Sequence, residues 1–156
     1  MFDIVRASLL ESQASLEKLL ADPETLQTIA QAGSLLAQRL ADKARVFSCG
    51  NGGSMCYRHD RPGLAAVAIS DPGHLSCVAN DYGYDHVFSR YLESHGRPGD
   101  CLLGISTSGR SPNILKAART ARDLGMHVIA LHGRPGCELE ALADFSIATP
   151  AGAYAD

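Results

Sequence analysis

The chain has 156 residues, of which 46% are apolar and 20% are charged, and its formal net charge is −3. This length and this balance are typical of one globular domain with a core of its own. The small negative charge argues against a nucleic-acid-binding surface, and no apolar run reaches the length of a membrane span. We therefore expect neither nucleic acid nor a membrane as a partner.

Five cysteines, an odd number without Cys-x-x-Cys spacing, indicate free thiols in a reducing compartment. The residues that follow Met1 lack the basic and apolar regions of a signal peptide, so we expect a cytoplasmic protein. Cys49 and Cys101 fall in apolar strand patterns and are predicted to lie in the core. Cys56 falls in a predicted loop and is the cysteine most open to chemistry.

Two amphipathic helices are predicted at the N-terminus, within residues 1–43. The first covers 2–21, where apolar residues recur at a spacing of three to four. The second begins after Asp22, a helix cap, with Pro23 in its first turn. Their apolar faces can pack either on the chain's own sheet or on a second subunit, and we favour a second subunit for at least one helix.

Strands and helices alternate over residues 44–156. This alternation predicts an α/β fold. We expect a single doubly wound domain over 1–156 with a five-stranded parallel sheet of the flavodoxin-like kind. Ligands bind such sheets at the carboxyl ends of the strands, where the strand order reverses. The expected strands are 45–49, 64–69, 100–105, 126–131 and 144–148; the expected helices are 84–95, 112–124 and 137–143, and 70–80 is expected to be a loop with a helical turn.

Two features depart from this architecture. Residues 50–63 join two parallel strands, a connection that is usually a helix, yet they include four glycines, a proline and no helical period. The chain also ends at Asp156, just after its fifth predicted strand. We expect that one helix is missing from the first crossover and another from the C-terminal flank.

The most informative motif lies between the third strand and the next helix, at residues 106–111, Ser-Thr-Ser-Gly-Arg-Ser. Ser111 suits the helix cap and Pro112 the first helical position. The first N–H groups of a helix lack internal partners and carry partial positive charge, so together with hydroxyls they form a cradle that usually binds phosphate. A plain capped turn needs one hydroxyl and this one has four, so we favour phosphate binding.

A glycine-rich loop, residues 50–54 (Gly-Asn-Gly-Gly-Ser), follows the first strand. Glycines let the backbone approach a ligand closely, and the Asn51 amide suits a sugar hydroxyl. The loop matches neither the dinucleotide fingerprint nor a P-loop, so no nucleotide cofactor is expected. Taken alone it is equally a tight turn. Because both loops follow strands, they could share one pocket of phosphosugar size.

The polar turn 80–83, Asn-Asp-Tyr-Gly, is expected to open a helix. Asp81 could act as a general base or hold a substrate hydroxyl, although a helix cap is the commoner role of such a residue. The six histidines include no pair at the i, i+4 spacing of a metal site. The residues alone thus indicate a phosphosugar pocket without a convincing acid–base pair and without a metal site.

Several motifs, in order, resemble the bacterial phosphoheptose isomerases of the sugar isomerase domain family. They are residues 48–54, 61–63, 68–71, 80–84, 88–90, 99–100 and 104–109. The likeness covers almost the whole chain, including the two leading helices. It implies conversion of D-sedoheptulose 7-phosphate into D-glycero-D-manno-heptose 7-phosphate, a step toward the heptose of lipopolysaccharide core or related surface glycans. It also implies a cytoplasmic homotetramer, often with zinc in the active site.

The resemblance also implies substrate contacts from both loops and from the 80–83 turn. Asn80 and Asp81 would hold sugar hydroxyls. The serine-rich loop would bind the phosphate, in agreement with its own chemistry. The implied substrate-binding residues are Asn51, Gly52, Gly53, Ser54, Asn80, Asp81, Ser106, Thr107, Ser108 and Ser111.

The family's catalytic residues are not found in this sequence. In the family, a helix after the glycine loop carries a histidine and a glutamate, and a C-terminal helix carries a glutamine and a histidine. These four supply the general base, the general acid and the zinc ligands. Asp156 corresponds to a position just before the second helix and is at most an assisting residue. We do not propose His59 or Cys56 as replacements.

Two explanations compete. Either the sequence omits segments that the complete protein has, or the protein is truly shortened and binds phosphosugar without turning it over. We favour the first, because so short a crossover would strain the fold and loss of the last helix would expose the sheet. An isomerase is the leading hypothesis. The alternatives are a protein-interaction regulator of the same fold and a non-catalytic phosphosugar sensor, and the four phosphate-facing hydroxyls argue against the regulator.

Overall fold

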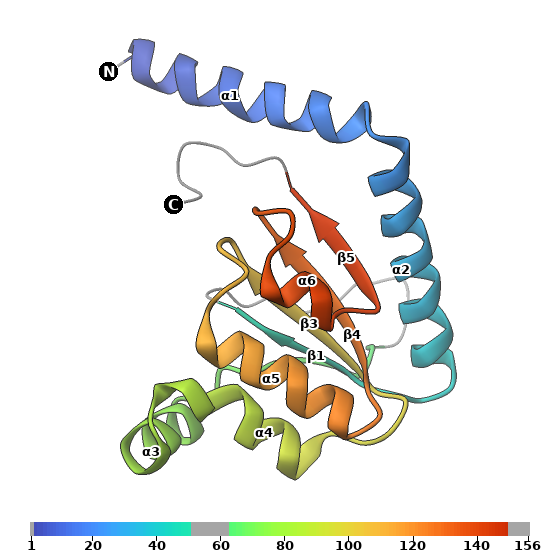
Figure 1. Ribbon diagram of the computed structural model, residues 1–156, viewed down its shortest axis with the longest axis vertical. Helices are drawn as coiled ribbons and strands as arrows, with labels where there is room; N and C mark the ends of the chain where they lie inside the picture. The colour runs from blue at the N-terminus through green and yellow to red at the C-terminus, as the bar shows by residue number, and fades with distance from the viewer. Residues whose placement is uncertain (1, 51–62, 150–156) are drawn as a thin grey trace.

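The computed structural model describes residues 2–50 and 63–149. It contains a five-stranded, all-parallel sheet in the order β2-β1-β3-β4-β5, with helices on both faces (Figure 1). This is the flavodoxin-like order, in which the direction of winding reverses between β1 and β3. The predicted fold class is confirmed. Across these two described ranges, none of the helices combines the length and the apolarity that crossing a membrane requires.

The five strands are short and lie close to their predicted positions. They are β1 (Val46–Cys49), β2 (Ala66–Ala68), β3 (Cys101–Ser106), β4 (His127–His132) and β5 (Phe145–Ala148). Only β2 differs by more than a residue at either end, since it covers half of the predicted 64–69. Most of the first crossover, residues 51–62, lies outside the described residues, so the expected absence of a helix there stays a prediction.

Two helices precede the sheet, as predicted: α1 (Phe2–Leu20) and α2 (Pro23–Ala41). Asp22 caps α2, because its carboxylate accepts hydrogen bonds from the N–H groups of Glu24 and Thr25. The Thr25 hydroxyl also donates to this carboxylate at 2.7 Å, and these bonds hold the pKa of Asp22 below its usual value.

The two N-terminal helices differ in what they bury. α2 lies on one face of the sheet, where Ala32 and Leu36 pack against Ile129 and Ile147 of the two last strands. α1 has no buried residue, and Figure 1 shows it standing away from the sheet. One helix therefore covers the chain's own sheet, and the other buries none of its residues against the described part of the chain.

Residues 70–80 form a helix rather than the expected loop: α3 covers Pro72–Tyr82. Asp71 caps it by accepting from the His74 N–H at 2.7 Å, and Pro72 occupies its first position. Gly83, with a φ of +87°, ends it. The predicted helix over 84–95 then begins as a single 3-10 turn, η1 (Tyr84–His86), before α4 (Val87–His95).

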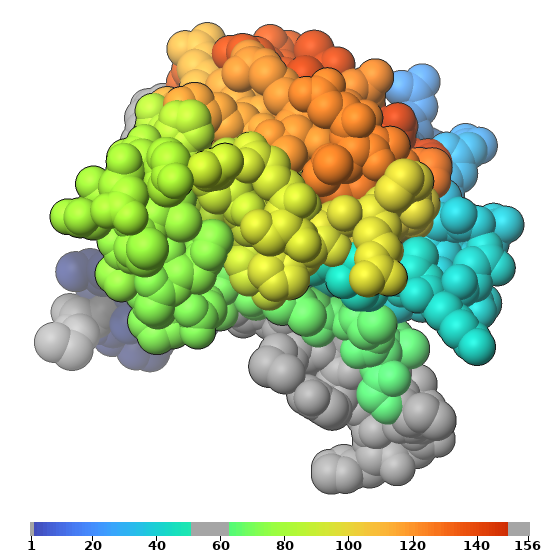
Figure 2. All heavy atoms as spheres, turned by 90° about the horizontal axis from the view of Figure 1, so that it is seen from below, coloured from blue at the N-terminus to red at the C-terminus, as the bar shows by residue number. Residues whose placement is uncertain are grey.

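The main core lies between the sheet and the helices that cover the face opposite α2. These helices are α3, α4, α5 (Pro112–Asp123) and α6 (Glu138–Leu142). Figure 2 shows α4 lying between α3 and α5 on the outside of this layer. Removing this apolar surface from water is the main force that holds the layers together. The largest fully buried side chains of this core include Val87 and Leu92 of α4, Leu102 of β3, Val128 of β4 and Leu139 of α6.

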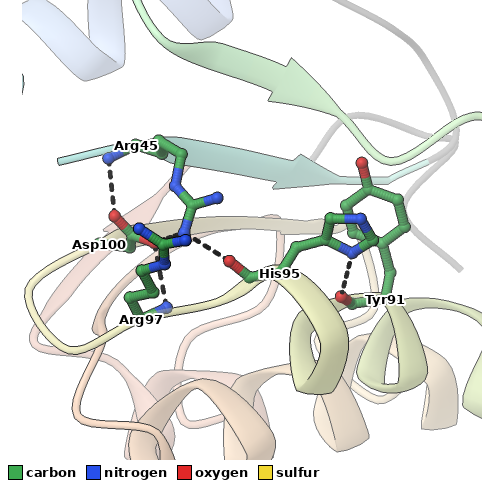
Figure 3. Close-up of polar contacts among 5 residues, drawn as sticks. All are labelled: Arg45, Tyr91, His95, Arg97 and Asp100. Atoms are coloured by element: carbon green, nitrogen blue, oxygen red, sulfur yellow. Dashed lines mark hydrogen bonds and ion pairs between the residues drawn. The ribbon is translucent and has the colours of Figure 1, made fainter.

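Asp100, in the turn before β3, is a buried carboxylate with 3% of its surface exposed. It accepts hydrogen bonds from the N–H groups of Arg45 (2.8 Å) and Arg97 (3.1 Å), and from the Arg45 guanidinium (2.8 Å; Figure 3). The Cys101 N–H donates to Arg45 O close by. These bonds join the amino ends of β1 and β3 and set the register in which Val46 pairs with Cys101.

We expect Asp100→Ala to lower the free energy of unfolding by about 3 kcal/mol, because two backbone N–H groups and a guanidinium lose a buried acceptor. Urea unfolding of the two proteins measures the difference. Asp123→Ala, at the exposed end of α5, is the control and should change stability by less than about 0.5 kcal/mol. A loss below about 1 kcal/mol for Asp100→Ala would contradict the anchoring role.

Candidate functional site

A pocket of about 250 Å³ opens at the carboxyl ends of β1 and β3, where the strand order reverses. One side comes from the end of β1 and the other from the connection between β3 and α5. The two loops that the sequence singled out therefore meet at one pocket, as far as their described residues extend. The described lining consists of Gly50, Ile105, Ser106, Thr107, Ser111, Asn113 and Ile114.

The β3–α5 loop folds back on itself around Ser106, a buried residue at the end of β3. Its hydroxyl accepts from the Gly109 N–H at 3.1 Å and lies 3.0 Å from the Ser111 hydroxyl. Gly109 has a φ of +63°, a conformation that favours glycine, and this closes the turn. The loop thus brings two of its serines into contact at the mouth of the pocket.

The helix α5 starts where the sequence predicts, but the Ser111 side chain does not cap it in the predicted way. Ser111 is the N-cap residue and Pro112 is the first helical residue. The Ser111 hydroxyl does not cap the helix, because it contacts Ser106, while the Ile114 N–H bonds to the Asn113 side chain at 2.9 Å. Since two hydroxyls in contact use only one of their two protons between them, one O–H remains for a ligand beside the positive end of α5.

Thr107 and Ser108 occupy different positions in the loop. Thr107 is exposed, lines the pocket, and its hydroxyl makes no hydrogen bond with another described residue. Ser108 is half-buried, and its hydroxyl accepts from the Arg110 N–H at 3.2 Å. Three of the four hydroxyls predicted to hold phosphate therefore line the pocket, and Ser108 lies next to it in the loop without lining it.

Gly50 forms the β1 side of the pocket. A Cβ atom at this position would lie 2.9 Å from Ile105 Cβ, so the close approach of the two strand ends requires glycine here. The remaining predictions for this side, Asn51, Gly52, Gly53 and Ser54, lie outside the described residues, as does Asp156.

Asn80 and Asp81 lie in the last turn of α3, so the expectation that they open a helix, with Asp81 as its cap, was wrong. Gly83 breaks the chain after them, and the next helical turn starts without a side-chain cap. Both residues are exposed, and the Asn80 amide donates to Asp81 Oδ1 at 2.8 Å. Neither belongs to the described lining of the pocket.

A cluster that the sequence did not point to lies at the end of β4. One ring nitrogen of His132, the Cys137 thiol and a Glu140 carboxylate oxygen all lie within 4.8 Å of one another, so the three could hold a metal ion. Histidine spacing could not reveal it, because its ligands come from a strand end, a turn and α6. The only signal in the sequence was the short interval from His132 to Glu140.

Cys49 and Cys101 lie in the core, as predicted. Burial raises the pKa of the Cys49 thiol to about 12 and that of Cys101 to about 11. Neither thiol ionises near neutral pH, so neither is a nucleophile under those conditions. Cys56 lies outside the described residues.

The chain is similar to known proteins over nearly its whole length. Residues 10–133 match the family model of the SIS domain. The phosphoheptose isomerases of Tolumonas auensis and Aeromonas hydrophila subsp. hydrophila are 48% and 51% identical to it, over 99% of this chain and 86% of theirs. The chain belongs to the phosphoheptose isomerase family of SIS domain proteins.

Solved structures of this family agree with the fold. The phosphoheptose isomerase from Neisseria gonorrhoeae superimposes with a TM-score of 0.87 at 36% identity, and covers 98% of this chain with 88% of its own. The enzyme from Francisella tularensis gives 0.86 at 32% identity, over 99% of this chain and 88% of its own. The family is one of isomerases that act on sugar phosphates, and the resemblance found in the sequence is confirmed.

The alignments are longer than this chain. Those with the Tolumonas and Aeromonas isomerases extend over 166 positions, against 156 residues in this chain. The isomerase relatives therefore have positions without a counterpart here.

Gly109→Ala tests how closely the β3–α5 loop packs. An added Cβ would overlap Cys137 Sγ, and the φ of +63° is strained for alanine, so we expect a loss of about 2–3 kcal/mol in unfolding free energy. Gly136→Ala is the matched control, since its φ is +72° and nothing lies within 4 Å of its added Cβ. The control should lose only about 1 kcal/mol. Equal losses in urea unfolding would contradict the contact.

Proposed function

We propose that this member of the phosphoheptose isomerase family converts D-sedoheptulose 7-phosphate into D-glycero-D-manno-heptose 7-phosphate. The reaction moves a proton between adjacent carbons through an enediol, and its product would supply heptose for lipopolysaccharide core or related glycans. The observation that carries the proposal is the hydroxyl-rich loop at the reversal point of the sheet. It occurs in a chain about half identical to proteins named phosphoheptose isomerase.

The substrate's phosphate would bind at the β3–α5 loop. The hydroxyls of Ser106, Thr107 and Ser111 face the same pocket as the N-terminus of α5. A dianion there gains hydrogen bonds from these hydroxyls and a favourable interaction with the helix dipole, without a cationic side chain in the described lining. We retain Ser108 as a fourth ligand, because its oxygen accepts from Arg110 and its O–H is left to donate.

The sugar would extend toward the end of β1. Gly50 leads there into the predicted contacts Asn51, Gly52, Gly53 and Ser54, of which the Asn51 amide offers both a donor and an acceptor to hydroxyl groups. We also retain Asn80 and Asp81 as proposed hydroxyl ligands, on the family resemblance alone.

Proton transfer requires a general base close to the carbon acid. The described lining of the pocket contains no carboxylate, imidazole or amine. The histidine–glutamate and glutamine–histidine pairs that the resemblance implies as base, acid and zinc ligands are missing from the sequence. Because the residues at this pocket do not fit zinc, we derive no step through a metal and assign no catalytic residue.

A second function fits the same pocket. Its described lining provides hydroxyl groups for phosphate but no acid–base group, and such a pocket can bind a sugar phosphate without converting it. The chain would then act as a phosphosugar sensor.

Two measurements on the purified protein separate these functions. A coupled assay follows turnover of sedoheptulose 7-phosphate, and calorimetry follows its binding. Turnover supports the isomerase, binding without turnover supports the sensor, and absence of both overturns the two proposals. The intact mass gives a further check. A value well above 16.5 kDa would mean that the purified protein contains additional residues, which could form the two missing helices.

Thr107→Val should weaken phosphosugar binding by about 1–3 kcal/mol, or roughly 5- to 150-fold in Kd, because valine keeps the shape of threonine and removes its hydroxyl. Ser108→Ala should have an effect in the same range if Ser108 also binds phosphate. Thr120→Val, near the far end of α5, is the control. Calorimetry that finds unchanged affinity for Thr107→Val would remove this residue from the phosphate site.

We further propose that the protein works in the cytoplasm. The four described cysteines, Cys49, Cys77, Cys101 and Cys137, are all free thiols. Free thiols are typical of proteins in a reducing compartment.

We also propose that the chain forms a homotetramer, with α1 in a contact between subunits. Exposed apolar side chains gathered on one helix often mark an interaction site, and the family resemblance implies that the partner is another copy of the chain. Seven large apolar side chains of α1 are 54–78% exposed: Phe2, Ile4, Val5, Leu9, Leu10, Leu16 and Leu20.

A double substitution, Leu9→Lys with Leu16→Lys, should reduce the oligomer to a smaller species, because it places two charges on the apolar face of α1. The control is Ala7→Lys with Ala14→Lys, which has the same spacing and charge about 200° around the helix from Leu9 and Leu16, away from the stripe formed by Phe2, Val5, Leu9, Leu16 and Leu20. Light scattering after gel filtration gives the masses. If the leucine variant keeps the mass of the wild type, α1 is not the contact.

A further inference from the structure

His132, Cys137 and Glu140 form a second site, separate from the phosphosugar pocket. Their ligand atoms lie within 4.8 Å of one another, although the residues come from the end of β4, the N-cap of α6 and the body of α6. We propose that these three side chains bind a divalent transition metal of the zinc class.

The three donor types select this class of metal. Thiolate and imidazole are the ligands that zinc prefers, and a carboxylate oxygen completes many of its sites. Magnesium and calcium favour sets made only of oxygen, so they fit this combination poorly. Three protein ligands leave a fourth position, and water can reach it because the Glu140 side chain is 42% exposed.

The His132 ring is buried and only half satisfied. Its side chain is 0% exposed, and Nε2 lies 2.6 Å from the Ser146 hydroxyl. Nδ1 has no hydrogen-bond partner within residues 2–50 and 63–149. In metal sites, one ring nitrogen of a histidine is usually held by a hydrogen bond while the other binds the ion. Buried polar atoms without partners are rare, so this ring points to a ligand.

The other two ligands are held close to the ring by the turn between β4 and α6. Gly136, with a φ of +72°, reverses the chain so that Cys137 and Glu140 return to the end of β4. The Gly136 N–H donates to Glu140 Oε2 at 2.6 Å, and this oxygen lies 4.0 Å from His132 Nε2. The carboxylate is therefore held beside the ring on its Nε2 side, and binding of an ion through Nδ1 requires the Glu140 side chain to turn toward that nitrogen.

The site shares no residue with the described lining of the pocket, but it supports the back of the β3–α5 loop. Gly109 lies against Cys137, where a Cβ would overlap the sulfur. The Leu139 N–H donates to Gly109 O at 3.2 Å, and the Gly133 N–H donates to Thr107 O at 3.0 Å. A metal bound by Cys137 would hold this contact in place and so restrict the loop that carries the hydroxyls.

The first test uses the full chain, stripped of metal by a chelator and titrated with Co²⁺ in the absence of any sugar phosphate. Co²⁺ bound by a thiolate gives a charge-transfer absorption band in the near ultraviolet. We expect this band in the wild type, in Cys77→Ser and in Cys56→Ser, and we expect its loss in Cys137→Ser. A band that persists in Cys137→Ser, or the absence of a band in the wild type, overturns the proposal.

The second test does not depend on the cysteine. Zn²⁺ affinity, measured by competition with a chromophoric chelator, should fall about tenfold or more in Glu140→Gln and stay unchanged in Glu138→Gln, an exposed neighbour on α6. Equal affinity in Glu140→Gln and the wild type overturns the proposal. Circular dichroism confirms that each variant is folded. Because no sugar phosphate is present, failure here leaves the isomerase proposal untouched.

Discussion

Asp100 joins the amino ends of β1 and β3, and the position of the pocket follows from that bond. Parallel strands keep one register along their length, so Val46 opposite Cys101 also sets Cys49 opposite Gly104 at the other end. Gly50 and Ile105 then come together, and the pocket opens beside them. A slip of one residue would turn Phe47 and Cys49 out of the core. A carboxylate at one end of the sheet thus fixes the geometry of the pocket at the other end.

The β3–α5 loop is the second structure on which the site depends, and it is supported from both sides. Toward the pocket, Ser106 bonds within the loop and leaves hydroxyl groups for an anion. Toward the protein, Gly109 packs on Cys137 and bonds to the first turn of α6. The pocket and the His132–Cys137–Glu140 cluster therefore act on opposite faces of one short segment. The hydroxyls proposed to bind phosphate lie among the described residues, whereas the described lining of the pocket holds no acid–base group for an isomerase.

The sequence predicted most of the fold because its signals were local. Apolar runs bounded by turns marked all five strands, and Asp22 with Pro23 marked α2. The same signal, Asp71 with Pro72, begins α3, where the expectation of a loop gave this cap too little weight. The pocket was predictable because strand ends converge in a parallel sheet. Two features were not predictable from the sequence: the contact of the Ser111 hydroxyl with Ser106, and the cluster of His132, Cys137 and Glu140. Both depend on contacts that the sequence pattern does not reveal.

The exposed apolar face of α1 has a consequence for how the molecule is built. A helix of 19 residues that buries no side chain in its own subunit gains nothing from the core. Isolated helices of this length are marginal in water, because nucleation is costly and packing supplies most helical stability in proteins. The first residues of the chain would then be fully helical only once subunits have met, so helix content should fall as the protein is diluted. If α1 forms the proposed contact between subunits, folding of this segment and assembly become one step.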